Sequence, residues 1–116
     1  MTSLVKDNSQ FKLNADLLLD LFSQFKLKLK NRVTAAYVFG STADGSWSAD
    51  SDFDLILVVE RADRPFIQRG FDFLDLFDIY PKLDLLIYTQ QELDAHLADS
   101  ALGFWKSVRE TMKKIL

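Results

Sequence analysis

Residues 40 to 54 carry the side chains of this chain that are best suited to chemistry. Gly40-Ser41 ends an apolar run, and Asp52 and Asp54 follow after ten intervening residues. Backbone N–H groups at a glycine turn, together with a serine hydroxyl, can hold phosphate. Closely spaced aspartates supply the oxygen ligands that Mg²⁺ prefers. A phosphate site beside a metal site indicates transfer of a phosphoryl or nucleotidyl group.

These aspartates are expected on one face of a buried strand. Strand alternation places Asp52, Asp54, Ile56 and Val58 on one face, and Phe53, Leu55, Leu57 and Val59 on the other. The Cα atoms of Asp52 and Asp54 would lie roughly 6.5 Å apart, so both carboxylates can reach the same ions. Asp84, in the apolar run 83–88, is the third candidate if the two strands are neighbours. Three such carboxylates can hold two metal ions, one on the triphosphate and one on the attacking hydroxyl.

Hydrophobic periodicity and end signals define the elements that position these residues. They predict a helix over 15–30 with Asn14 as N-cap, a strand over 33–39, and a loop over 40–51 with a helical turn after Ser41. A strand over 53–59, a helix over 66–80 and a strand over 83–88 follow. A capping box of Thr89 and Glu92 then begins a helix that runs to the C-terminus, bent near Gly103. Residues 1–10 are polar and are expected to form a flexible tail, which leaves 11–116 as a single domain.

Composition narrows the class of protein. A chain of 116 residues with 48% hydrophobic and 27% charged residues is typical of one soluble globular domain. No apolar stretch approaches the ~20 residues that span a bilayer, and the N-terminus has no secretory signal. The absence of cysteine fits a cytoplasmic location. A net charge of −3 argues against a nucleic-acid partner, which usually requires a basic surface.

The spacing of Gly40-Ser41 and Asp52-Phe53-Asp54 resembles the signature of the nucleotidyltransferase superfamily of DNA polymerase β. In size the chain is similar to the minimal nucleotidyltransferases, and the order of its elements matches theirs over nearly the whole chain. The resemblance implies an α/β fold in which helices pack on a small mixed sheet. It also implies ATP as donor and Mg²⁺ bound by Asp52, Asp54 and Asp84.

Many minimal nucleotidyltransferases are antitoxins that transfer AMP from ATP to a tyrosine of a HEPN-type toxin. The resemblance therefore implies such a toxin as partner, with Gly40 and Ser41 holding the phosphates. The family commonly has Ala-Arg-Gly where this chain has Ala43-Asp44-Gly45. An anion in place of a cation should weaken ATP binding. Arg61 or Arg64 could replace the missing cation, because both follow the second predicted strand. The length of that strand argues against this, since Arg61 would lie roughly 20 Å from Asp54.

Other interpretations remain open. A simple hairpin with a polar loop would have a similar local pattern. The chain could be an inactive antitoxin that acts by binding alone, which Asp44 and the apolar segment 66–80 would favour. That segment could contact a partner chain or form a homodimer, or it could be more buried than one face requires. A nucleotidyltransferase of the aminoglycoside type ranks lower, because so short a chain would need a second domain or subunit to shape the acceptor pocket. Trp47, in the loop, could cover substrate or contact a partner.

Overall fold

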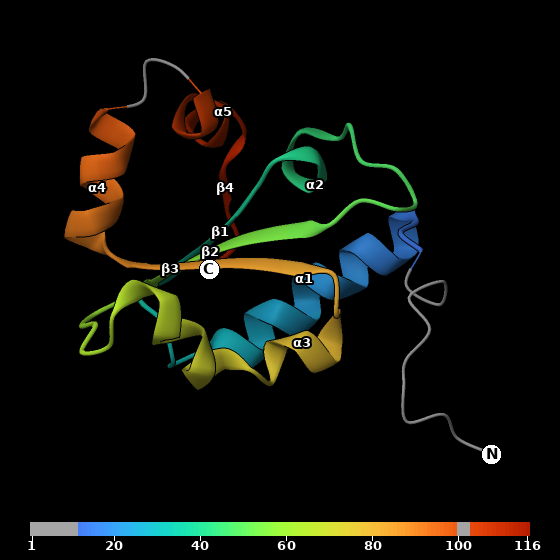
Figure 1. The fold of residues 1–116 in the computed structure, drawn as a ribbon. Coiled ribbons are helices and arrows are strands. Elements are labelled where there is room, and N and C mark those ends of the chain that lie inside the picture. The colour runs from blue at the N-terminus through green and yellow to red at the C-terminus, as the bar shows by residue number, and fades with distance from the viewer. Residues whose placement is uncertain (1–11, 100–102) are drawn as a thin grey trace.

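The computed structural model describes residues 12–99 and 103–116, and it contains a four-stranded mixed sheet with helices on both sides (Figure 1). The strand order is β3-β2-β1-β4, with β1 antiparallel to β2 and β4 and β2 parallel to β3. The strands are β1 (Ala35–Phe39), β2 (Phe53–Val59), β3 (Leu83–Thr89) and β4 (Lys113–Lys114). The helices are α1 (Ala15–Leu29), α2 (Ser41–Asp44), η2 (Phe66–Phe73), α3 (Leu76–Ile79), α4 (Gln90–Ala98) and α5 (Gly103–Thr111).

Strand alternation divides the interior into two apolar layers, as predicted. Phe53, Leu55 and Leu57 of β2 pack toward the layer that includes α1 and α3. Ile56 and Val58 pack toward α4 and α5 on the opposite face, and Figure 1 shows these two helices on the other side of the sheet from α1 and α3. Asp52 and Asp54 follow the parity of Ile56, so they belong to the face covered by α4 and α5.

Both predicted N-caps are confirmed. The Asn14 side chain accepts a hydrogen bond from the Leu17 N–H at 2.9 Å and begins α1. Thr89 and Glu92 form the predicted capping box at the start of α4. The predicted tail, residues 1–10, lies outside the described residues.

The prediction of one helix over 66–80 is wrong, because the segment forms the 3₁₀ helix η2 and the short helix α3. Arg32 explains much of the interruption. Its guanidinium donates to the Asp72 carbonyl at 3.0 Å, which in an α-helix would accept from Leu76, and it also binds the Asp75 carboxylate at 2.8 and 3.0 Å. Gly70 weakens the helix further. Several apolar side chains of this segment are exposed to solvent, and Ile67 is 87% exposed.

The prediction of one bent helix after Thr89 is also wrong. Helix α4 ends at Ala98, and α5 begins separately at Gly103, whose φ of +74° is a left-handed conformation that favours glycine. The chain then leaves α5 and adds β4 to the edge of β1, where the Ala36 carbonyl accepts from the Ile115 N–H at 2.8 Å. Ala101 of the predicted apolar stripe lies outside the described residues. In the described part of the chain, no helix has the length and apolar character needed to cross a membrane.

Candidate active site

The three predicted aspartates meet at one corner of the sheet. Asp54 is the second residue of β2 and pairs in register with Asp84, the second residue of β3. Paired residues of neighbouring strands lie about 4.8 Å apart and point to the same face. Asp52 immediately precedes β2. The sheet therefore positions all three acids at the same end of its α4/α5 face.

The charges of the three aspartates interact. Partial burial, and then the negative charges of Asp84 and Asp52, raise the pKa of Asp54 to about 6. A half-buried carboxylate between two like charges is costly to ionise, and a bound cation would remove that cost. Carboxylates with raised pKa values are frequent at functional sites, so Asp54 is a candidate ligand for a cation.

The Gly-Ser turn lies directly against these carboxylates. Phe39 pairs with Asp54 across β1 and β2, so Gly40 follows at the same corner. A Cβ atom at Gly40 would lie 2.5 Å from Asp54 Oδ2, and the φ of Gly40 is +71°. The conformation therefore favours glycine, and any larger side chain would also displace the Asp54 carboxylate. The antiparallel pairing of β1 and β2 is the hairpin of the simpler interpretation, and the loop of this hairpin carries the Gly-Ser turn.

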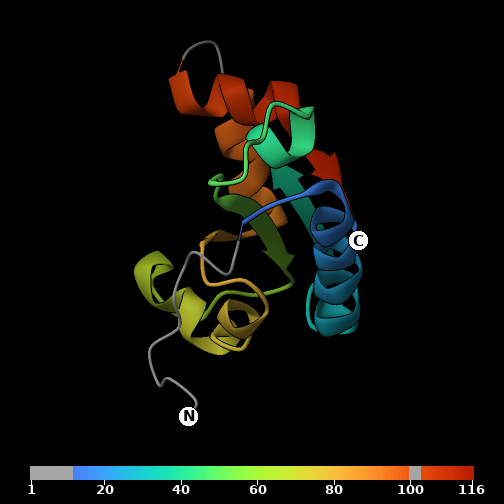
Figure 2. The ribbon, with the colours of Figure 1, turned by 90° about the vertical axis from the view of Figure 1, so that its right-hand side faces the viewer.

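Helix α2 begins directly after Gly40, as the predicted helical turn. The Gly40 N–H is already used, because it donates to the Thr111 hydroxyl of α5 at 2.9 Å. The Ala43 and Asp44 amides are also used, because both donate to the Gly40 carbonyl at 3.1 Å. The amides of Ser41 and Thr42 and the Ser41 hydroxyl are the remaining groups that could hold phosphate. Both views place α2 beside α5, which makes α5 part of the wall of the site (Figures 1 and 2).

The acids fit magnesium as part of an incomplete ligand set. Within residues 12–99 and 103–116, no three Asp, Glu, His or Cys side chains converge closely enough to surround one ion. Magnesium does not require such a cage, since it commonly uses one or two carboxylates and completes its octahedron with water and substrate phosphate. The pairing of Asp54 with Asp84, and the effect of Asp52 on its pKa, meet that requirement.

Asp44 stands exposed at the end of α2. Hydrogen bonds from Ser46 hold the pKa of Asp44 below its usual value, and the nearby positive charge of Lys113 contributes. Lys113 belongs to β4 and pairs with Val38, which packs toward the α1 side of the core. Trp47 of the same loop packs against the α1 side of the core and lines a groove with Lys113.

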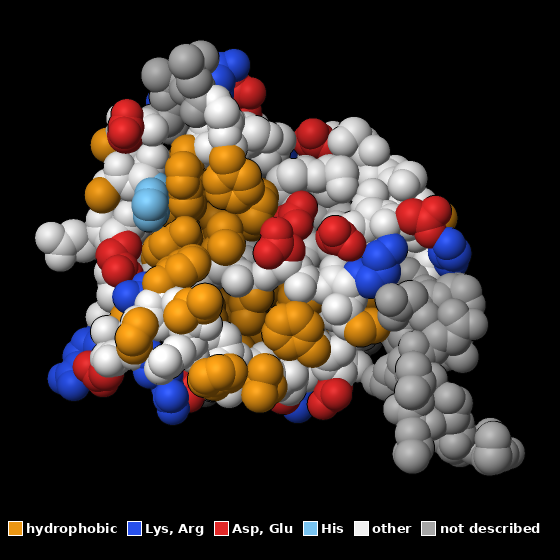
Figure 3. All heavy atoms as spheres, viewed as in Figure 1, with side chains coloured by type: hydrophobic (Ala, Val, Ile, Leu, Met, Phe, Trp, Pro, Cys, Tyr) orange, Lys and Arg blue, Asp and Glu red, His pale blue; other side chains and the backbone are white. Residues whose placement is uncertain are grey.

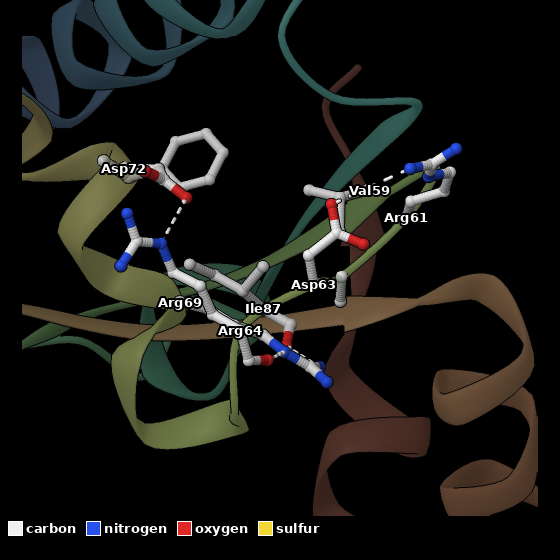
Figure 4. A pocket seen from close by; sticks show the side chains of 9 residues that line it. Val59, Arg61, Asp63, Arg64, Arg69, Asp72 and Ile87 are labelled. Atoms are coloured by element: carbon white, nitrogen blue, oxygen red, sulfur yellow. Dashed lines mark hydrogen bonds and ion pairs between the residues drawn. The ribbon is translucent and has the colours of Figure 1, made fainter.

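The hollows lined by Arg61 and Arg64 lie far from the aspartates. A hollow of about 450 Å³ opens at the end of β2, where Val59 is roughly 16 Å from Asp54 along the strand. Figure 4 shows arginine side chains around it. Arg64 is 3.4 Å from Asp72 and Arg69 is 2.8 Å from Glu92, so these positive charges are balanced within the chain. Neither Arg61 nor Arg64 can serve the Gly-Ser turn.

Comparison with known proteins identifies the class that this geometry indicates. The family model "Polymerase beta, Nucleotidyltransferase" matches residues 24–115, and the chain therefore belongs to the polymerase β nucleotidyltransferase family. A "putative nucleotidyltransferase" of known structure from Sulfolobus solfataricus shares the fold, with a TM-score of 0.56 and 18% identity over 80% of this chain and 85% of that chain. That identity supports the fold alone. No curated protein sequence matches the chain.

The predicted family and fold class are thus confirmed, while one residue beside the site was missed. Thr111 reaches the Gly-Ser turn from the C-terminal end of the chain, where its hydroxyl accepts a hydrogen bond from the Gly40 N–H. Its position depends on the end of α5 and on the two-residue strand that follows. Neither feature interrupts the helical periodicity from which the sequence was interpreted.

Proposed function

We propose that this protein transfers AMP from Mg·ATP to a hydroxyl group, and that the acceptor is a tyrosine of a HEPN-type toxin in the cytoplasm. The observation that carries the proposal is the contact of Gly40 with Asp54, which itself pairs with Asp84. This corner combines a turn suited to phosphate with carboxylates suited to a divalent cation.

Each side chain has a role in that reaction. The Ser41 hydroxyl and the amides of Ser41 and Thr42 would hold the β- and γ-phosphates. Asp52 and Asp54 would hold two ions, with water and phosphate as the remaining ligands. Asp84 would bind the second ion and assist removal of the acceptor proton. The acceptor oxygen forms a bond to the α-phosphorus, the bond to the bridging oxygen breaks, and pyrophosphate leaves. When bound, Mg²⁺ would neutralise phosphate charge and lower the pKa of the attacking hydroxyl.

A second candidate function is neutralisation of the partner by binding alone. Exposed Asp44 beside the turn favours it, since an anion there opposes a triphosphate. Ile67 and the neighbouring apolar side chains of η2 offer a contact surface.

Label transfer separates the two functions. The chain would be mixed with Mg²⁺, ATP labelled at the α-phosphate, and the HEPN-type protein encoded beside it. We expect label in the partner, none from γ-labelled ATP, and loss of labelling with Asp54→Asn but not with Asp78→Asn on exposed α3. Partner inhibition that survives Asp52→Ala combined with Asp54→Ala, without labelling, would instead establish the binding function.

A further inference from the structure

An exposed aromatic ring stands on the wall of the candidate active site. Phe104, in the first turn of α5, is 52% exposed. Its ring centroid lies 5.8 Å from that of Phe39 at an interplanar angle of 87°, and 5.3 Å from that of Trp105 at 85°. Both contacts are edge-to-face, and the contact with Phe39 packs the ring against β1 while about half of its surface stays open.

The rings behind Phe104 are themselves supported. Trp105 stacks on His96 at 4.4 Å with an interplanar angle of 7°, and it also contacts Tyr88 at 5.6 Å. Tyr88 is buried in the α4/α5 layer. The exposed ring therefore belongs to a rigid aromatic cluster and differs from isolated exposed side chains such as Leu27 of α1, which is 78% exposed.

Strand pairing places this cluster beside the carboxylates. Phe39 is paired with Asp54, and directly paired residues point to the same face of a sheet. Phe104 covers Phe39, while Thr111 at the other end of α5 accepts the hydrogen bond of Gly40. Helix α5 thus contacts the phosphate turn with one end and presents a ring with the other. Figure 3 shows an apolar patch adjoining acidic side chains on the face of the molecule that it displays.

The combination indicates one class of ligand. A cluster of carboxylates selects a metal-bound anion, and an open aromatic face selects a flat ring. A nucleotide carries both groups at opposite ends. We propose that Phe104 is the stacking surface for the base of the bound nucleotide, an inference that rests on the proposed function and identifies where the base lies.

Stacking of this kind has a recognisable specificity. Aromatic rings stack on every base without reading its hydrogen-bonding edge, and the larger purine ring stacks more strongly. The ring of Phe104 offers no hydrogen-bond donor or acceptor to the edge of a base. Purine nucleotides should therefore bind more tightly than pyrimidine nucleotides, with little preference between adenine and guanine from Phe104 itself.

The test compares Mg·ATP with Mg·tripolyphosphate, which has the phosphates but no base, by calorimetry on the purified chain. Phe104→Ala should weaken Mg·ATP binding by about fivefold to a hundredfold and leave tripolyphosphate binding unchanged. Phe104→Leu keeps an apolar contact with Phe39 but cannot stack, so it should lose most of the same affinity. Leu27→Ala is the control and should change neither ligand.

Two further outcomes are informative. In a Trp47→Phe background, Trp105 becomes the single tryptophan, and its emission should change with Mg·ATP but not with Mg·tripolyphosphate. If Phe104→Ala and Leu27→Ala bind Mg·ATP equally, while tripolyphosphate binding still requires Asp54, the stacking role is wrong and the proposed function stands. If the wild-type chain binds neither ligand, both proposals are wrong.

Discussion

Asp54→Asn should stabilise the protein in the absence of metal while removing its response to magnesium. The pKa of Asp54 is raised from 3.8 to about 6 by burial and by its acidic neighbours. At about 1.4 kcal/mol per pKa unit, the shift corresponds to at most about 3 kcal/mol of destabilisation when the group is ionised. Because the side chain is half exposed, solvent screening reduces this to about 1–2 kcal/mol. The neutral amide avoids that cost.

The pH dependence has a defined sign. The folded-state pKa of Asp54 exceeds its unfolded value, so its contribution to stability is complete below pH 3.8 and is lost as the pH rises through about 6. The stability advantage of Asp54→Asn should therefore be small near pH 4.5 and complete above about pH 6.5. At neutral pH it should raise the Tm by several degrees, about 4–8 °C.

Urea unfolding followed by circular dichroism, at several pH values and in EDTA or Mg²⁺, measures both effects. Wild-type protein should gain stability from Mg²⁺ at neutral pH and gain less near pH 5, where Asp54 is largely protonated. The variant should not respond, and Asp78→Asn, on exposed α3, should behave as wild type. A variant that is less stable than wild type at pH 7.5 in EDTA, or equally stabilised at pH 4.5 and 7.5, would refute the reasoning.

Two further predictions concern the frame of the site. Gly40→Ala should cost about 1–2 kcal/mol more than Gly45→Ala by urea unfolding, because Gly40 has φ 71° and ψ −150°, a conformation almost restricted to glycine, whereas Gly45 has the left-handed helical values φ 87° and ψ 1°. An equal cost would mean that the turn does not depend on this conformation of Gly40. Glu92→Gln should destabilise by about 1–2 kcal/mol at neutral pH after allowance for its exposure, because the hydrogen bond with Arg69 lowers the pKa of Glu92 to about 2. The stabilisation by ionised Glu92 is present above its unfolded pKa and is lost as the pH falls. The Tm difference between wild type and Glu92→Gln should therefore vanish between pH 4.5 and about 2. A difference that stays constant over this range would indicate lost packing.

The sequence predicted the parts of the site that depend on short-range pattern. Alternation along β2 fixed the face of Asp52 and Asp54, and the β-branched and apolar run fixed the strand itself. Asn14 and Thr89 marked helix starts through bonds that span three residues. These features depend on residues that are close together in the sequence, so a single sequence is enough to predict them.

What the sequence did not predict depends on contacts between distant segments. Arg32 donates a hydrogen bond to the carbonyl of Asp72, which lies 40 residues later in the sequence, and replaces the backbone hydrogen bond of an α-helix there. A segment with helical periodicity therefore becomes two shorter helices. The C-terminal residues have a helical pattern up to Ile115, yet the open edge of β1 offers Ala36 as a hydrogen-bond partner and draws them into β4. Propensity yields to tertiary hydrogen bonding at both places.

The second of these differences, the pairing of the C-terminal residues with β1, bears directly on function. Because the chain leaves α5 at Thr111 and pairs with β1, the end of the helix is fixed beside Gly40 and Lys113 is fixed near Asp44. A continuous C-terminal helix would have carried both residues past the sheet. Lys113 itself pairs with Val38, which packs toward the α1 side of the core, so the sheet directs Lys113 away from the α4/α5 face that carries Asp54. Lys113→Ala should therefore leave Mg·tripolyphosphate binding unchanged, as should Lys30→Ala on the exposed end of α1. A loss of binding with Lys113→Ala alone would show that its charge does reach the phosphates.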